Sequence, residues 1–394
     1  MVYADNAATT KMSRTAIDAM LPYMETHYGN PSSLYRLGQE AAEALQSARE
    51  TVAACLGCTP REITFTSGGS EADNQALISA ARIGERKGKQ HIISTVFEHH
   101  AILHTLKKLE KEGFEVELLP VGPTGTVTAQ QVADAIRPDT SLVTPMYANN
   151  EIGSILPIAE IGAVCREKGV LFHTDAVQAA GHLHINVNEQ NIDMLSLSGH
   201  KFHGPKGTGV LYARQGIPLT NIIEGGAQER GKRAGTENVP GIMGLAAALK
   251  EACDHIDENA AKVSALRDQL IAGLSQIPHS ALNGDPVHRL PGNVNFCFEG
   301  IEGESLLLLL DQAGICASSG SACTSGSLDP SHVLLAIGRP HEVAHGSLRL
   351  SLCEWNTQED VDHILKEVPR IVAYLRSISP VWKDLASGKK QFML

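Results

Sequence analysis

The feature that most constrains the fold is a regular alternation of short apolar runs with helix-like runs between residues 62 and 175. Four of the apolar runs read "EITFTS", "HIISTVFEH", "SLVTPMYA" and "VLFHTD", and helical patterns separate them. Alternation of this kind predicts a parallel or mostly parallel sheet with helices on both faces. Ligands of such sheets bind at the carboxyl ends of the strands. We therefore expect an α/β fold whose functional residues follow the strands.

The pattern changes near residue 255. A long amphipathic helix is expected from about 240 to 276, and short strands such as "NVNFCF" then alternate with helices and loops. This part predicts a smaller α+β domain. We expect a large domain over residues 15–255 and a small domain formed by residues 1–14 and 256–394.

Composition excludes several functional classes. The chain has 394 residues, is 43% hydrophobic and carries a formal net charge of −11. Nucleic acids and anionic membranes call for a basic surface, so neither is expected as a partner. The sequence has no run of about eighteen apolar residues and does not begin with a basic stretch followed by an apolar core, so we expect a cytoplasmic location. The eight cysteines are sparse and irregular, which predicts reduced thiols.

One lysine has an unusual setting. Lys201 lies in "LSGHKFHGPKG", a small polar turn with no Asp, Glu, Arg or other Lys within four positions. An amine that forms a Schiff base must be neutral part of the time, and a desolvated pocket or a nearby cation lowers the pKa of lysine enough to allow it. Lys201 is therefore a candidate Schiff-base lysine, and the alternative is an ordinary turn lysine before the strand "GVLY".

An acid at the end of an apolar run strengthens this hypothesis. Asp175 closes "VLFHTD", at the place where open α/β sheets put ligand groups. Pyridoxal 5'-phosphate (PLP) needs a lysine for its aldehyde and an acid that keeps its pyridine nitrogen protonated. Together, Lys201 and Asp175 predict PLP as the cofactor.

Three other strand ends carry candidate ligands. Gly69 and Ser70 in "SGGSEADN" open a helix, which favours either a phosphate site or a simple N-cap. His99 ends "HIISTVFEH", where an imidazole can stack on an aromatic ligand or serve only as a loop residue. Asn150 in "NNEIG" is placed to bond a phenolic oxygen or a carboxylate.

The second half of the chain adds an anion site and a nucleophile. The segment "RAGTENVP" carries Thr236 among donors suited to a phosphate. Arg349 lies in the apolar strand "GSLRLSL" and must be paired, either with a substrate carboxylate or in a structural salt bridge.

Cys323 lies in a polar loop. This setting favours a nucleophile that moves with its loop over a structural cysteine, which is normally buried. The pair Cys55 and Cys58 has no further ligands in sight, and no metal site is expected.

Taken in order, the motifs resemble those of the NifS/IscS-like cysteine desulfurases, PLP enzymes of the class V aminotransferase family. They are "DNAATT", "TSGGSEADN", "EHHAIL", "NNEIG", "HTDAVQAAG", "SGHKFHGPKG", "RAGTENVP" and "SSGSACTSGS". A cysteine in a long SSGSACTS loop marks group I of the family, and the RAGHHC-like pattern of group II is absent. The resemblance implies the PLP-dependent transferase fold type I, with a mostly parallel seven-stranded sheet in the large domain.

The resemblance also implies a role for each candidate. Lys201 would hold PLP, His99 would stack on its ring and assist proton transfer, and Cys323 would become a persulfide. Asn150 would contact both cofactor and substrate, and Arg349 would bind the substrate carboxylate. The other cofactor contacts would be Asp175 to the pyridine nitrogen, Gln178 to the phenolic oxygen, and Gly69, Ser70, Ser198, His200 and, from the neighbouring subunit, Thr236 to the phosphate.

The implied activity is conversion of L-cysteine to L-alanine, with the sulfur passed through Cys323 to iron–sulfur cluster assembly or a related thiolation. The resemblance further implies a homodimer and a U-type iron–sulfur scaffold protein as the sulfur acceptor. Three rival functions stay open. A selenocysteine lyase would turn over without Cys323, and an ordinary aminotransferase would need an oxo acid. A silent sulfur-relay or adaptor subunit is disfavoured because Lys201, Asp175, His99 and Cys323 are all present.

Overall fold

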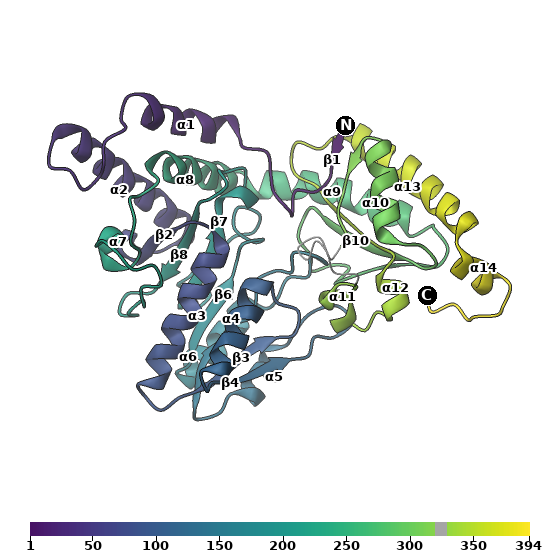
Figure 1. Cartoon of the computed structure of the whole chain (residues 1–394), viewed down its shortest axis with the longest axis horizontal. Helices are drawn as coiled ribbons and strands as arrows, with labels where there is room; N and C mark the ends of the chain where they lie inside the picture. The colour runs from purple at the N-terminus through teal and green to yellow at the C-terminus, as the bar shows by residue number, and fades with distance from the viewer. Residues whose placement is uncertain (320–328) are drawn as a thin grey trace.

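The computed structural model describes residues 1–319 and 329–394 and has two lobes, with helix α9 (Ile256–Leu274) running between them (Figure 1). The first lobe is built on a seven-stranded sheet in the order β2-β8-β7-β6-β5-β3-β4. Strand β8 pairs antiparallel with β2 and β7, and the other neighbours pair in parallel. The mostly parallel sheet predicted from the sequence is thus confirmed. Its strands are β2 (Ile63–Thr66), β3 (His91–Thr95), β4 (Glu115–Leu119), β5 (Thr140–Val143), β6 (Leu171–Asp175), β7 (Met194–Ser198) and β8 (Gly209–Ala213).

Helices cover both faces of this sheet, because successive strand residues enter different apolar clusters. Ile92 packs with residues of α3 and α4, whereas Ile93 belongs to the cluster that holds residues of α2, α6 and α8. In the same way, Leu142 packs into the cluster with α3 and α4, and Val143 packs into the cluster with α2, α6 and α8. The helices of this lobe are α1 (Arg14–Glu25), α2 (Arg36–Leu56), α3 (Gly69–Glu85), α4 (His100–Lys111), α5 (Ala129–Ala135), α6 (Ile158–Lys168), α7 (Gln228–Gly231) and α8 (Val239–Asp254), with short 3₁₀ turns at η1 (Pro60–Glu62) and η2 (Gly199–Lys201).

Three expected elements end earlier than the sequence suggested. The run "HIISTVFEH" is a strand only as far as Thr95. The run "SLVTPMYA" is a strand only as far as Val143, since Pro145 has no N–H for a ladder and restricts the residue before it. The helix expected from 240 to 276 is two helices that meet at His255, whose φ is −121°. The His255 side chain accounts for the break, because its Nδ1 bonds the Glu251 carbonyl at 2.8 Å and so satisfies one of the last carbonyls of α8.

The second lobe has an apolar core of its own. Its antiparallel sheet has the order β12-β10-β9, and β1 pairs in parallel with β11. Val2 and Ala4 belong to this core, so the first residues of the chain pack here before α1 begins in the other lobe (Figure 1). Val333, by contrast, packs into the first lobe's core. The domain limits predicted above stay a prediction. The elements are β1 (Val2–Tyr3), β9 (Ser280–Leu282), β10 (Asn293–Phe298), α10 (Gly303–Gln312), β11 (Ile315–Cys316), α11 (His332–Ala336), α12 (His341–Ala344), β12 (Ser347–Ser351), α13 (Gln358–Ile378) and α14 (Pro380–Ala386).

Two of the longest helices, α2 and α13, carry charged residues along much of their length. Over the described ranges, no helix combines the length and the apolar character that crossing a membrane requires.

Candidate active site

A cavity of about 340 Å³ opens where the carboxyl ends of β6 and β7 face β12 and the first residues of the chain. Most of the residues predicted from the sequence line it together, although they come from distant segments. They are Gly69, Ser70, His99, Asn150, Asp175, Gln178, Ser198, His200, Lys201 and Arg349. Thr236 does not reach this cavity and is exposed, and Cys323 lies outside the described residues.

The lysine is presented by a tight turn that follows β7. In this turn Gly199 lies against the Thr208 side chain, where an added Cβ would come within 2.7 Å of the hydroxyl oxygen. The Lys201 amine donates hydrogen bonds to the carbonyls of Ala7 at 2.6 Å and Ala8 at 2.9 Å. The segment after β1 therefore crosses directly over the amine, a contact that the sequence analysis missed.

Asp175 is a buried carboxyl at the end of β6. Burial raises the pKa of Asp175 to about 6, against the lowering effects of a hydrogen bond from the Val177 N–H at 2.9 Å and the Lys201 charge. Behind it lies Asp73, which is 1% exposed. Burial and the neighbouring Asp175 raise the pKa of Asp73 well above its ordinary value. A cationic ring nitrogen against Asp175 would stabilise its ionised form, so this carboxyl suits a protonated pyridine.

His99 caps the N-terminus of α4, and this fixes its tautomer. The Ala101 N–H donates to His99 Nδ1 at 3.1 Å, so Nδ1 carries no proton and the neutral ring has its N–H at Nε2. Burial, reinforced by the nearby Lys201 charge, lowers the pKa of His99 to about 4. At neutral pH the cavity therefore holds a neutral imidazole with a defined donor.

The N-terminus of α3 supplies an anion cradle. Gly69 and Ser70 form its first turn, and a shallow hollow of about 410 Å³ joins them to Ser198, His200 and Lys206. Helix N-termini attract phosphate through free N–H groups and the helix dipole. Burial and the Lys201 charge lower the pKa of His200 to about 4, and its Nδ1 lies 3.0 Å from the Thr9 hydroxyl. Lys206 is a cation of this hollow that the sequence analysis did not single out.

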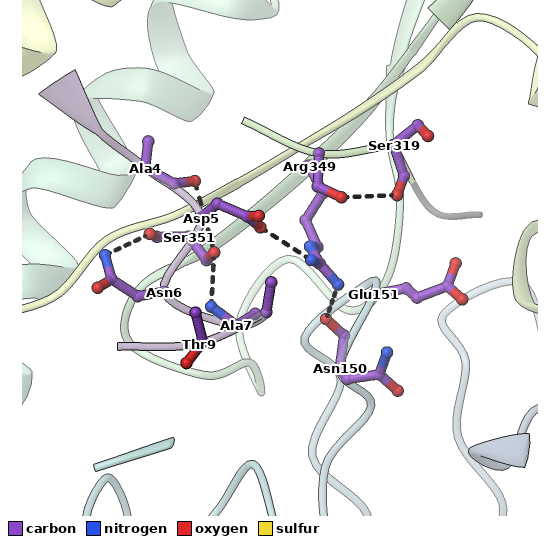
Figure 2. A network of polar contacts seen from close by, with 12 residues as sticks. Ala4, Asp5, Asn6, Ala7, Thr9, Asn150, Glu151, Ser319, Arg349 and Ser351 are labelled. Atoms are coloured by element: carbon purple, nitrogen blue, oxygen red, sulfur yellow. Dashed lines mark hydrogen bonds and ion pairs between the residues drawn. The ribbon is translucent and has the colours of Figure 1, made fainter. Parts of the chain in front are cut away.

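Arg349 lies at the opposite end of the cavity and is 3% exposed. Figure 2 shows its guanidinium between Asp5 and Asn150. One nitrogen is 2.9 Å from an Asp5 carboxylate oxygen, and another donates to the Asn150 carbonyl at 3.1 Å. Its Nε is buried without a hydrogen-bond partner among the described residues. The salt bridge that the sequence left open as an alternative is therefore present.

These groups fit PLP in chemical kind and in place. A lysine amine, a buried carboxyl and an anion cradle occupy the carboxyl-end edge of the sheet, and an arginine lines the same cavity. The sequence analysis missed Asp5, Ala7 and Ala8, although "DNAATT" was noted as a motif. The signal was available in that motif, but only the fold shows that it lies over Lys201.

Comparison with known proteins gives the family of the chain. The model of the class-V aminotransferase family matches residues 2–364. The cysteine desulfurase IscS of Clostridium botulinum is 53% identical over 393 residues, which covers 99% of both chains. Among solved structures, a NifS-like protein is 38% identical with a TM-score of 0.89, over 95% of this chain and all of the other. The structure of SspA in complex with cysteine is 37% identical with a TM-score of 0.79, over 91% of this chain and all of the other.

The chain belongs to the class-V aminotransferases. Within that class it is a PLP-dependent cysteine desulfurase of the IscS and NifS type. The resemblance stated from the motifs is thereby confirmed, together with the fold, the activity and the cofactor.

Proposed function

We propose that this chain converts L-cysteine to L-alanine, transfers the sulfur to Cys323 as a persulfide, and passes it on for iron–sulfur cluster assembly or a related thiolation. The observation that carries the proposal is the convergence of Lys201, Asp175, His99 and Arg349 on one cavity. The reaction balances, because L-cysteine and one thiol give L-alanine and one persulfide. The carbon–sulfur bond of the substrate breaks, and a sulfur–sulfur bond forms at Cys323.

PLP, when bound at Lys201, supplies the electron sink that this chemistry needs. Asp175 keeps the ring nitrogen protonated, and Gly69, Ser70, Ser198 and His200 hold the phosphate end. Once substrate takes its place on the cofactor, the Lys201 amine is free to accept the proton from the substrate α-carbon. The Ala7 and Ala8 carbonyls accept hydrogen bonds from the amine and so hold it in place.

His99 and Arg349 orient the reactants. The neutral His99 ring would lie against the cofactor with its proton on Nε2, without adding a positive charge beside Lys201. Arg349 lines the same cavity and would bind the substrate carboxylate with its guanidinium. Asn150 also lines the cavity and would contact both the cofactor and the substrate.

The described residues on either side of the loop with Cys323 support its role. Ser318 exchanges two backbone hydrogen bonds with Arg349, at 3.1 and 2.6 Å. Ser331 donates to the buried carboxylate of Glu151, the residue after Asn150. The chain thus enters and leaves the loop beside the substrate end of the cavity.

The proposal includes a homodimer, a U-type scaffold protein as acceptor and a cytoplasmic location. Thr236 supports the dimer, since an exposed residue outside its own cavity can serve the phosphate site only from a neighbouring subunit. The seven described cysteines are all free, which suits a reducing compartment. Analytical ultracentrifugation tests the dimer, and a monomer that is fully active would exclude the shared site.

Peptide mass spectrometry tests the persulfide directly. Protein treated with L-cysteine and no added thiol, then alkylated, should carry one extra sulfur on the peptide with Cys323. Cys316→Ala, which removes the nearest described thiol in the sequence, should leave that signal unchanged. Extra sulfur found only on another cysteine would refute the assignment of Cys323.

A further inference from the structure

Three metal-binding side chains meet on the far side of the Lys201 turn. The ligand atoms of His203, Cys353 and Glu354 all lie within 4.8 Å of one another. His203 follows the η2 turn, and the other two follow β12, so the cluster brings together parts of the chain that are far apart in sequence. None of the three lines the cofactor cavity. The activity described above gives this cluster no role.

The imidazole of His203 is held in one orientation. Its Nδ1–H donates to the Lys11 carbonyl at 2.8 Å, and its ring packs on Trp355 with centroids 4.1 Å apart. A hydrogen bond from Nδ1 to a backbone carbonyl is the usual way in which a metal-binding histidine is oriented through its other nitrogen. The backbone of His203 has a φ of +63°, a conformation that residues with a side chain rarely adopt.

The other ring nitrogen points into the cluster with no hydrogen bond to hold it. Nε2 of His203 is buried and has no hydrogen-bond partner in the described part of the chain. The residue itself is 5% exposed. The nearest Glu354 oxygen is 3.2 Å away, close enough for an ion pair but outside hydrogen-bond geometry. Although burial opposes the shift, the contacts with Cys353 and Glu354 raise the pKa of His203 to about 10, so in the metal-free protein Nε2 carries a proton whose place a bound cation would take.

The spacing suits a small divalent ion. Tetrahedral zinc with nitrogen and oxygen ligands at about 2.0–2.1 Å places those two ligand atoms roughly 3.3 Å apart, and the Nε2 to oxygen distance here is 3.2 Å. A cavity of about 30 Å³ is lined by all three residues, which is room for one ion and little more. The Glu354 side chain is 25% exposed and gives the ion a way in from solvent.

We propose that His203, Cys353 and Glu354 bind one zinc ion, with water as the fourth ligand. One nitrogen, one sulfur and one oxygen form a donor set that zinc accepts, whereas magnesium and calcium require oxygen ligands. The charges balance, since a thiolate and a carboxylate neutralise the ion around a neutral imidazole. The Cys353 thiol proton and the proton on His203 Nε2 both leave to solvent as the metal binds.

Such an ion would fasten the active-site turn to the second lobe. His203 is two residues after Lys201, and Cys353 is four residues after Arg349. Through Lys11 the same imidazole also holds the segment that crosses over the lysine. The ion would therefore tie the cofactor lysine and the substrate arginine to one point while touching neither.

Zinc binding to untagged holoenzyme tests the proposal. The protein carries Cys323→Ser, so that the loop thiol cannot bind the metal, and is freed of metal with a chelator before it is dialysed against zinc chloride alone. Atomic absorption should find one zinc per chain. Cys353→Ala should lose it, and Glu354→Gln should bind at least about tenfold more weakly. Cys55→Ala, which removes a half-buried free thiol elsewhere, should keep it.

Two results would overturn the proposal. One is the absence of zinc from the parent protein, which would leave the cluster as an ion pair between His203 and Glu354. The other is zinc that persists in Cys353→Ala or disappears in Cys55→Ala. If Cys353→Ala does not fold, cobalt titration of the parent decides, because a cobalt–thiolate charge-transfer band should appear there and its absence would refute cysteine ligation.

Discussion

The ion pair between Asp5 and Arg349 leads to a prediction in which stability and substrate affinity move in opposite directions. Arg349 is 3% exposed, and among the described residues the Asp5 carboxylate, 2.9 Å away, is its only salt-bridge partner (Figure 2). Asp5→Asn keeps the shape of the side chain and removes its charge. The guanidinium then stays buried with neutral acceptors only, which are the new amide oxygen and the Asn150 carbonyl.

The cost in stability follows from the burial of the pair. Removing one partner of a fully buried ion pair costs about 3–5 kcal/mol. The side chain of Asp5 is 21% exposed, and solvent there screens part of its charge. We therefore expect Asp5→Asn to lower the free energy of unfolding by about 1–3 kcal/mol. Urea denaturation of the holoenzyme measures this change.

The effect on substrate binding has the opposite sign. A substrate carboxylate on Arg349 shares the guanidinium with Asp5, and two like charges about 5 Å apart repel by about 3 kcal/mol at an effective dielectric constant of about 20. Solvent at Asp5 reduces this to about 1 kcal/mol, which corresponds to roughly a fivefold change in affinity. Asp5→Asn should therefore lower KM for L-cysteine about fivefold.

Alanine formation at varied L-cysteine gives KM, and Asp5→Glu serves as the control that keeps the charge. A KM that rises in Asp5→Asn, or stays unchanged while stability falls, would refute the reasoning. Asp5 would then serve to align Arg349 for its substrate instead of competing with it.

Three further predictions concern the lysine, the imidazole and a buried carboxyl. Lys201→Ala should lose covalent attachment of PLP, so borohydride reduction and peptide mass spectrometry should label only the parent protein; a label elsewhere in the parent would displace Lys201 from its role. His99→Gln retains an N–H donor and should keep PLP bound while kcat falls roughly 10²–10⁴-fold, and an unchanged kcat would remove His99 from proton transfer. Burial raises the pKa of Glu151 from 4.5 to about 7. The native state therefore holds a proton that the unfolded chain has released, and stability falls by about 3 kcal/mol as pH rises through that window. Glu151→Gln should flatten this part of the pH dependence in urea titrations near pH 5 and 8, and equal slopes for the two proteins would contradict the assignment.

Much of the first lobe could be predicted because local sequence decides it. The helix ending at Leu56 is followed by Gly57 with a φ of 72°, a C-cap that the sequence already marks. The carboxyl end of β6 can also be predicted from the residue pattern alone. The same holds for the glycine-rich N-terminus of α3. The strand predicted from "SLVTPMYA" is longer than β5. The apolar run continues past Pro145, whereas the hydrogen bonds between neighbouring strands do not.

The rest of the site depends on contacts between segments far apart in the chain. Nothing in the residues near Lys201 shows that the Ala7 and Ala8 carbonyls will accept from its amine. Likewise, an arginine in an apolar strand predicts a partner, but only the fold selects Asp5. In the cluster at His203, the other two residues lie about 150 positions later in the sequence, so no local spacing motif could predict it.

The measurement that most directly tests the proposed role of Cys323 is alanine and sulfide release from L-cysteine, with a reducing thiol present. The wild type and Cys323→Ala are compared as holoenzymes with equal PLP content. We expect equal amounts of alanine and sulfide from the wild type, and a variant that retains PLP but does not turn over. Full turnover by Cys323→Ala would contradict the role of Cys323, and no alanine from either protein would contradict the reaction itself.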